Sequence, residues 1–375
     1  MRCSLYVHLP FCRSKCRYCD FYSVADREEL IDGYLDAVAR EWELHTERTS
    51  VELTSVYIGG GTPSLLSMAQ WEYFGSLLFD KLTLVNDAEW TVECNPESFT
   101  EEKARLFADM GVNRLTFGIQ SMQDRELVTA GRPHTSHEVL KVLAAPVLRR
   151  FRSVAVDVIY GLPGQTLDSF ADTLRQLLYK PVVRHFSAYE LTLVEGTPFG
   201  RHRSLLPFPA EDELEEIVHV LGTAADRYGF RQYEVSNYAR MGYECRHNIG
   251  YWNHSPYIGL GCAAHSYLHP YRSWNITDIA GYCSRVREGL LPVERREKLS
   301  AEMAGREMIF LGLRQRTGID EERFTAATGI PFASMVSKTL LERFRADGYL
   351  EFDSPCWKPT KKGLLFADFM ARELF

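Results

Sequence analysis

Apolar and polar positions follow a regular pattern through the first two hundred residues. Short apolar runs typical of buried strands occur at residues 5–9, 56–58, 90–94, 115–119, 154–159 and 186–191. Longer segments with helical spacing of apolar residues lie between them, as at residues 27–48 and 68–79. Another helix is expected to begin at the cap residue Thr100 and to end at Gly111. This alternation predicts parallel βα units in an α/β fold.

Polar residues and glycines gather where the predicted strands end. The set comprises His8, Gly59-Gly60-Gly61-Thr62, Glu93, Gln120, Asp157 and Glu190. Because the carboxyl ends of parallel strands meet at one rim of a barrel, the site of reaction is usually built there. A single such residue would carry little information. One on each successive strand predicts a single cavity that is lined from several sides.

Composition and charge narrow the class of protein. The chain has 375 residues, of which 45% are hydrophobic and 25% charged, which is typical of a globular protein and excludes wholesale disorder. The formal net charge of −7 gives no global sign of a nucleic-acid or anionic-membrane partner. No apolar run is long enough to span a membrane, and no signal-peptide core precedes Cys12. We therefore expect a cytoplasmic protein.

Three of the nine cysteines lie directly after the first predicted strand. Cys12, Cys16 and Cys19 have the spacing C-x3-C-x2-C, and clustered thiolates in a reducing compartment indicate a metal centre. Iron–sulfur clusters are normally held by four cysteines, so three ligands would leave one iron open to a small molecule. A structural zinc site is the alternative, with Cys3 or His8 as the fourth ligand. The other cysteines are scattered and are expected to be small buried apolar residues.

Six short segments carry distinctive combinations of residues. They are YVHLPFC at 6–12, GGGTPS at 59–64, ECNP at 93–96, FGIQS at 117–121, DVIYGLPG at 157–164 and HNIGYW at 247–252. Together they resemble the radical S-adenosylmethionine (SAM) superfamily, and within it the coproporphyrinogen dehydrogenase-like group. The resemblance implies a partial (β/α)6 barrel with an α+β extension and a winged-helix-like C-terminal domain. It also implies a 4Fe–4S cluster on Cys12, Cys16 and Cys19 whose open iron binds SAM and whose electron cleaves the sulfonium to a radical.

The resemblance also assigns roles to residues of the predicted cavity. The residues expected to bind SAM are Tyr6, Gly60, Gly61, Thr62, Glu93, Gln120, Arg132 and Asp157. Three of them, Gln120, Arg132 and Asp157, would also serve a second SAM molecule where one is bound. Glycines suit such a site because a backbone without Cβ atoms lets a ligand approach closely. Simpler alternatives are a tight strand-to-helix turn for the glycines and a helix cap or ion pair for Asp157.

Two activities occur in the group that these motifs indicate. Its oxygen-independent coproporphyrinogen III dehydrogenases decarboxylate two propionates, and they carry a further cysteine two residues after the third ligand and a long N-terminal segment. This chain has Phe21 at that position and only five residues before Tyr6. Both features resemble the heme chaperones of the group, which deliver heme to acceptor hemoproteins. We expect such a chaperone, with peripheral contact to membrane hemoproteins left open and the dehydrogenase as the alternative.

A segment rich in ring side chains is the direct indication of a heme partner. Between residues 228 and 274, Tyr, Trp, Phe and His occupy about 32% of positions, against about 15% in the whole chain. This composition suits a flat apolar macrocycle with histidine as an axial iron ligand. The predicted heme-binding residues are those of the chaperones' H-N-x-x-Y-W motif: His247 as the ligand, with Asn248, Tyr251 and Trp252. His254, His265 and His269 are competing ligands, and a satisfied buried histidine is the alternative reading of His247.

The C-terminal region predicts helices followed by a short β-wing. Helices are expected at residues 299–314, 320–328, 332–347 and 360–374, and a strand at 348–352. Winged-helix modules often bind DNA, but from residue 295 onward 14 basic residues face 12 acidic ones, so we expect packing or protein contact and no nucleic acid. The expected division is a barrel at 1–200, the extension at 201–294 and the C-terminal domain at 295–375. The resemblance leaves a homodimer open.

Overall fold

The computed structural model describes residues 1–47 and 49–375 of the chain. Its centre is a sheet whose strands follow the order β14-β13-β12-β11-β1-β4-β5-β6-β7-β8-β10-β9. The parallel strands that form the barrel wall are β1 (Arg2–Leu9), β4 (Glu52–Gly60), β5 (Leu84–Cys94), β6 (Arg114–Gln120), β7 (Ser153–Tyr160) and β8 (Val183–Glu190). These are the strands that the apolar runs predict, in sequence order. The predicted α/β fold with a partial (β/α)6 barrel is confirmed.

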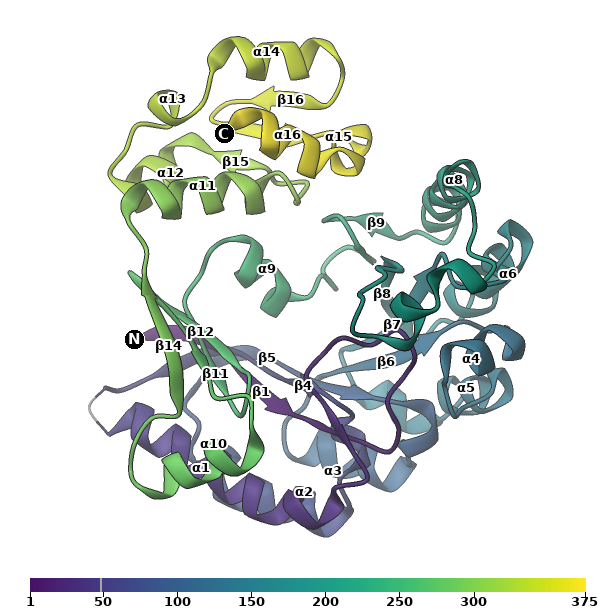
Figure 1. Cartoon of the computed structure of the whole chain (residues 1–375), viewed down its shortest axis with the longest axis vertical. Helices are drawn as coiled ribbons and strands as arrows, with labels where there is room; N and C mark the ends of the chain where they lie inside the picture. The colour runs from purple at the N-terminus through teal and green to yellow at the C-terminus, as the bar shows by residue number, and fades with distance from the viewer. Residues whose placement is uncertain (48) are drawn as a thin grey trace.

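Helices connect these strands and cover the outer face of the wall (Figure 1). They are α1 (Ile31–Thr46), α2 (Met68–Leu77), α3 (Glu101–Asp109), α4 (Asp124–Ala130), α5 (Ser136–Leu143) and α6 (Leu167–Leu178). The predicted cap Thr100 accepts a hydrogen bond from the Lys103 backbone at 3.2 Å, and Gly111, at φ +97°, follows the end of α3. The predicted end of the first helix, Arg48, lies outside the described residues.

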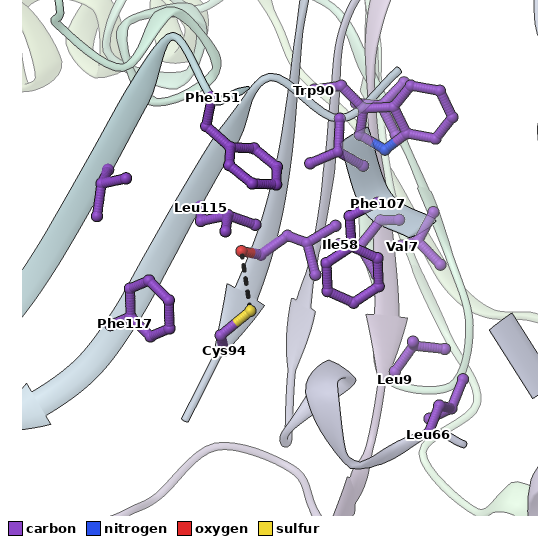
Figure 2. Close-up of a cluster of buried hydrophobic side chains, with 14 of the residues drawn as sticks. Val7, Leu9, Ile58, Leu66, Trp90, Cys94, Phe107, Leu115, Phe117 and Phe151 are labelled. Atoms are coloured by element: carbon purple, nitrogen blue, oxygen red, sulfur yellow. Dashed lines mark hydrogen bonds between the residues drawn. The ribbon is translucent and has the colours of Figure 1, made fainter. Parts of the chain in front are cut away.

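Alternation along the strands separates an apolar outer face from a polar inner face. Residues such as Val7, Ile58 and Leu115 point outward and are fully buried under the helices, and Figure 2 shows this layer packed around Trp90 and Phe107. Each such side chain contributes about 1.5–3 kcal/mol by leaving water. The intervening residues face the barrel interior and include most of the polar residues that the strand ends predict. Burial of the outer layer therefore fixes which side chains enter the interior.

The extension continues the barrel sheet at both edges. On one side β11 (Tyr257–Leu260) pairs in parallel with β1 and is followed by the antiparallel strands β12 (His265–Leu268), β13 (Tyr271–Asn275) and β14 (Val293–Lys298). On the other side β10 (Asn237–Ala239) pairs with β8, and β9 (Arg231–Gln232) with β10. The helices of this region are α7 (Pro198–Arg201), α8 (Glu211–Arg227), α9 (Arg246–Trp252) and α10 (Ile279–Arg287). A small separate pair, β2 (Phe11–Cys12) and β3 (Val24–Ala25), flanks the cysteine loop.

The C-terminal residues form a unit with its own apolar core. Its helices are α11 (Ala301–Gly312), α12 (Glu321–Thr328), α13 (Phe332–Met335), α14 (Lys338–Ala346), α15 (Lys361–Leu365) and α16 (Ala367–Leu374), and its sheet is β15 (Ile319–Asp320), β17 (Cys356–Pro359) and β16 (Leu350–Asp353). The helix predicted at 332–347 is divided, because Ser337 caps a new helix there. The helix predicted at 360–374 breaks at Phe366, and Thr360 caps its first part.

Figure 1 shows α9 between the barrel sheet and the C-terminal helices, and it contacts both β4 and α11. None of the described helices has the length and apolar character needed to cross a membrane.

Candidate functional site

A cavity of about 440 Å³ opens at the carboxyl ends of the barrel strands. Of the residues predicted for the cluster and for SAM, those that line it are Cys12, Cys16, Cys19, Gly60, Gly61, Thr62, Glu93, Gln120, Arg132 and Asp157. They come from loops or ends of the first five strands, and Glu190 on β8 lines the cavity as well. The structure thus brings residues from the whole barrel rim to one place.

The three clustered cysteines are half-buried at the wall of this cavity. A line of polar side chains connects two of them. The Arg132 guanidinium donates to Cys16 Sγ at 3.4 Å and to Asn95 Oδ1 at 2.9 Å. The Asn95 amide donates to Thr62 Oγ1 at 3.1 Å, and that hydroxyl donates to Cys12 Sγ at 3.7 Å. Donors aimed at sulfur stabilise thiolates, so this line suits a set of metal-bound cysteines.

No group of three Cys, His, Asp or Glu side chains within residues 1–47 and 49–375 is placed to hold a single metal ion. The zinc alternative therefore has no three-ligand site within that part of the chain.

Two acidic side chains, Glu93 and Asp157, line the cavity. Glu93 accepts hydrogen bonds from the Tyr57 hydroxyl at 2.7 Å and from the Gly60 backbone at 3.2 Å. Burial raises the pKa of Glu93 to about 7, although the bond from Tyr57 opposes this shift. Burial likewise raises the pKa of Asp157 to about 6, against the nearby charges of Arg114 and Arg132. A cation bound beside either group would favour its charged form.

Several polar atoms of the cavity lack a partner. Among the described residues, Gln120 Oε1, Arg132 Nε and Asp157 Oδ1 are buried and form no hydrogen bond. Gln120 also has a positive φ of 72°, at an irregularity in the pairing of β6 with β7. A buried polar atom without a partner costs about 1–3 kcal/mol, and backbone strain of this kind clusters at functional sites. These atoms indicate that the cavity is shaped for a polar ligand.

The glycines after the second strand are required by close packing. A Cβ at Gly60, whose φ is +111°, would lie 2.5 Å from the His8 ring, and one at Gly61 would lie 2.6 Å from the Phe11 carbonyl oxygen. A Cβ at Gly59 would meet the Glu93 carboxylate at 2.8 Å. The three glycines thus allow the ends of β1 and β4 to approach each other, and they leave room for the Glu93 carboxylate. This packing is compatible both with a tight strand-to-helix turn and with a role of the glycines in SAM binding.

Tyr6 is the one predicted SAM residue that does not line the cavity. Its hydroxyl is 2.9 Å from His8 Nδ1, and its ring packs 6.2 Å from that of Tyr57. His8 is buried, with Nε2 3.0 Å from the Tyr22 carbonyl oxygen. Tyr6 and His8 therefore lie behind the cavity wall and support it.

The HNxxYW segment forms most of α9, deep in the barrel. His247 is 1% exposed, and both ring nitrogens have partners: Nδ1 lies 2.9 Å from Ser55 Oγ, and Nε2 lies 2.9 Å from the Tyr251 hydroxyl. The ring also packs 5.1 Å from that of Tyr57. Burial lowers the pKa of His247 to about 3. In this conformation the imidazole is part of the core, and its role as a heme ligand stays a prediction.

The rest of the motif lies at the edge of this core. Tyr251 packs edge-on against Tyr257 of β11, at 4.6 Å between ring centroids. Trp252 is half-buried, and its indole N–H has no partner among the described residues. Asn248 is half-buried next to them. Glu89, from β5, accepts hydrogen bonds from the first backbone amides of α9, from Arg246 at 3.2 Å and His247 at 3.0 Å.

Some residues of the site were not found by sequence reasoning. Tyr57 and Asn95 line the cavity and hold Glu93, Arg132 and Thr62 in place. Tyr57 is two residues before Gly59 on the same strand face, and Asn95 belongs to the ECNP segment. The alternation of strand β4 could have indicated Tyr57, but its bond to Glu93 depends on the register between β4 and β5.

The cysteine-lined cavity at the rim of a parallel barrel defines the class of protein. Residues 6–177 match the radical SAM superfamily, and residues 299–366 match the HemN C-terminal domain. The chain is 32% identical to the heme chaperone HemW of Bacillus subtilis, over 87% of each chain. It is 33% identical to the HemW of Escherichia coli, over 99% of this chain and 97% of the relative, and 33% identical to that of Mycobacterium tuberculosis, over 99% and 94%.

The chain therefore belongs to the radical SAM superfamily and, within it, to the HemW family. The structure of coproporphyrinogen III oxidase (HemN) from Escherichia coli has the same fold, with a TM-score of 0.85, 23% identity, and coverage of 98% of this chain and 89% of that one.

Proposed function

We propose that this protein is a heme chaperone of the radical SAM type, which binds a 4Fe–4S cluster, SAM and heme and delivers heme to acceptor hemoproteins in the cytoplasm. The observation that carries the proposal is the 32–33% identity to proteins named HemW, over 87–99% of this chain. Phe21, which is 68% exposed beside the cavity, supports it, because the dehydrogenases of the group are expected to carry a cysteine there.

The residues of the cavity fit a cluster and SAM. The thiols of Cys12, Cys16 and Cys19 would hold three irons, and the unpaired atoms of Gln120, Arg132 and Asp157 offer partners to a polar ligand beside them. When bound, the two cofactors would supply one-electron cleavage of the SAM sulfonium.

The chain's own groups would bind and orient SAM. Glu93 and Asp157 offer carboxylates to its amino group and to its sulfonium or ribose, and Arg132 offers a cation to its carboxylate. Thr62 and the glycine run bring backbone amides to the same wall, and Tyr57 holds Glu93 in place. The cavity also limits the access of water to the bound molecule.

Heme would be held by the aromatic extension, which includes His247, Asn248, Tyr251 and Trp252. The extension joins the barrel at β1, and its His247 ring packs 5.1 Å from the ring of Tyr57, which lines the cavity. We also propose that the barrel spans residues 1–200, the extension residues 201–294 and the C-terminal domain residues 295–375. The separate apolar core of the C-terminal domain supports this division.

Two parallel assays on anaerobically reconstituted protein test this function. In the first, hemin is titrated and the Soret band is followed, then myoglobin without heme is added as an acceptor. In the second, coproporphyrinogen III, SAM and a reductant are added and the products are separated by chromatography. The proposal expects heme binding and transfer without decarboxylation. Stoichiometric decarboxylation would overturn it in favour of the dehydrogenase, and a wild type that does not bind heme would contradict the chaperone function.

A further inference from the structure

The inner face of the extended sheet carries a row of ring side chains that begins at the cavity. Tyr57 on β4 lines the cavity and is paired with Tyr6 on β1, which is paired with Gly259 on β11. Farther along the same row, His265 on β12 is paired with Trp274 on β13. Paired residues point to the same face of a sheet, so these rings share the face that bounds the SAM cavity.

Gly259 leaves a gap in this row. A Cβ there would lie 2.0 Å from the His265 carbonyl oxygen, so the close approach of β12 to β11 permits only glycine. The gap separates Tyr6 from His265. As a result, no side chain of β11 flanks the His265 ring in this row. On its other side the His265 ring stacks on the Trp274 ring, with 5.7 Å between the ring centroids and an interplanar angle of 17°.

The histidines of the extension differ in whether their nitrogens are engaged. His247 is buried with both nitrogens hydrogen-bonded. In His254, Nδ1 lies 3.3 Å from the Tyr267 hydroxyl and Nε2 lies 3.1 Å from Glu307. His269 is exposed, with Nδ1 3.3 Å from Tyr267. His265 is exposed, and neither of its nitrogens has a hydrogen-bond partner among residues 1–47 and 49–375.

A positively charged side chain, Arg295, lies at the end of the same row. Arg295 on β14 is paired with Trp274, and its guanidinium lies 5.0 Å from the centre of the indole ring. Arg295 is exposed, and no acidic side chain of the described residues forms a salt bridge with it. The neighbouring Arg272, by contrast, is paired with Glu307. An unpaired guanidinium beside an aromatic ring suits a carboxylate on the edge of an apolar molecule.

We propose that His265 is the axial ligand through which this chain binds heme iron, with the Trp274 edge against the macrocycle and Arg295 paired with a propionate. An imidazole that binds iron stands upright on the macrocycle, so the Trp274 ring, nearly parallel to it, would meet the heme with its edge. The site lies on the sheet face that continues into the SAM cavity. This inference rests on the proposed function and assigns the ligand role to His265 in place of the buried His247.

The test is a hemin titration of the full chain, anaerobically reconstituted, in five forms. These are the wild type, His265→Ala, His269→Ala, Arg295→Gln and, as a matched control, His137→Ala, which removes an exposed histidine from α5 on the outer wall. We expect His265→Ala to weaken hemin binding at least about tenfold, to shift the Soret band, and to recover the band when free imidazole is added. His269→Ala and His137→Ala should leave affinity and band unchanged.

A second arm tests the propionate contact. Arg295→Gln should weaken hemin binding about threefold to tenfold, and the difference from wild type should vanish when the dimethyl ester of heme replaces hemin. An unchanged Soret band in His265→Ala, with normal hemin binding by the wild type, would overturn the assignment of His265 and leave the chaperone function standing. Failure of the wild type to bind hemin would instead contradict the chaperone function itself.

Discussion

The cavity at the barrel rim and the motif histidine below it differ in how completely their hydrogen bonds are satisfied. At the rim, the cavity contains three buried atoms without partners, on Gln120, Arg132 and Asp157. One layer deeper, His247 on α9 has a partner on each nitrogen. Because unpaired buried polar atoms destabilise a fold, they persist where a ligand completes them. A motif histidine can therefore belong to the core while the unpaired polar groups lie in the cavity.

Tyr57 connects the two regions. Its ring packs against His247, its hydroxyl donates to Glu93, and it lines the cavity. A motif that marks the family can therefore affect the proposed SAM site through the ring and the hydroxyl of Tyr57. Substitutions that act on one region and spare the other separate the two contributions.

The largest effect is expected from the cysteines of the cavity. Changing Cys12, Cys16 or Cys19 to Ser should abolish the proposed cluster, because each change would remove one of its three thiolate ligands, and iron content should fall from about four per chain to near zero. Iron and sulfide analysis after anaerobic reconstitution provides the measurement. Cys356→Ser is the control, since this half-buried cysteine lies in β17 far from the cavity, and it should retain full iron content.

The next effect concerns stability. His247→Ala should lower the free energy of unfolding by about 2–4 kcal/mol, because it opens a space in the core and leaves Ser55 and Tyr251 without their partner. His265→Ala, at an exposed position, should change it by less than about 0.5 kcal/mol. Urea denaturation of the protein without cofactors measures both. Equal stability of His247→Ala and wild type would contradict the core role of His247.

Much of this architecture can be predicted from the sequence. The barrel strands, the Thr100 cap and the cysteine loop are encoded locally, by apolar runs and by residue spacing. The burial of His247 could not be predicted, because it depends on α9 entering the barrel beside Ser55 and Tyr57, which lie nearly two hundred positions earlier in the chain. The joining of the extension to β1 and β8 is likewise a long-range pairing that local patterns do not encode.

A substitution at the carboxylate should affect SAM and leave the fold intact. Glu93→Gln should weaken SAM binding roughly 10- to 100-fold, because it removes the charge that in the proposed site would face the amino group of SAM, while it keeps the shape of the side chain. Equilibrium dialysis with labelled SAM measures the change. Glu190→Gln, at the exposed rim of the same cavity, is the control and should stay within about twofold of wild type.

The pKa of Glu93 predicts a pH dependence of the same binding. The carboxyl group is protonated below its pKa of about 7 and charged above it. SAM affinity should therefore rise by up to about tenfold between about pH 6 and about pH 8 in the wild type. In Glu93→Gln this rise should be lost. A wild-type profile that falls over this interval would contradict the assigned role of Glu93.

The smallest effect is expected from the residue that joins the two regions. Tyr57→Phe removes the hydrogen bond to Glu93 and keeps the ring against His247, so SAM binding should weaken about fivefold while stability changes by less than about 1 kcal/mol. Because the hydrogen bond from Tyr57 lowers the pKa of Glu93, its loss should also raise the pH at which SAM binding is half-complete. Tyr57→Leu, which removes the ring as well, should lose both affinity and stability.

The most direct test of the account is electron paramagnetic resonance of the reduced, anaerobically reconstituted protein, with and without SAM. If three cysteines of this cavity hold a 4Fe–4S cluster beside a site built for SAM, the spectrum should change when SAM is added and should change far less in Glu93→Gln. A cluster signal that SAM leaves untouched, or protein that takes up zinc and no iron, would contradict it.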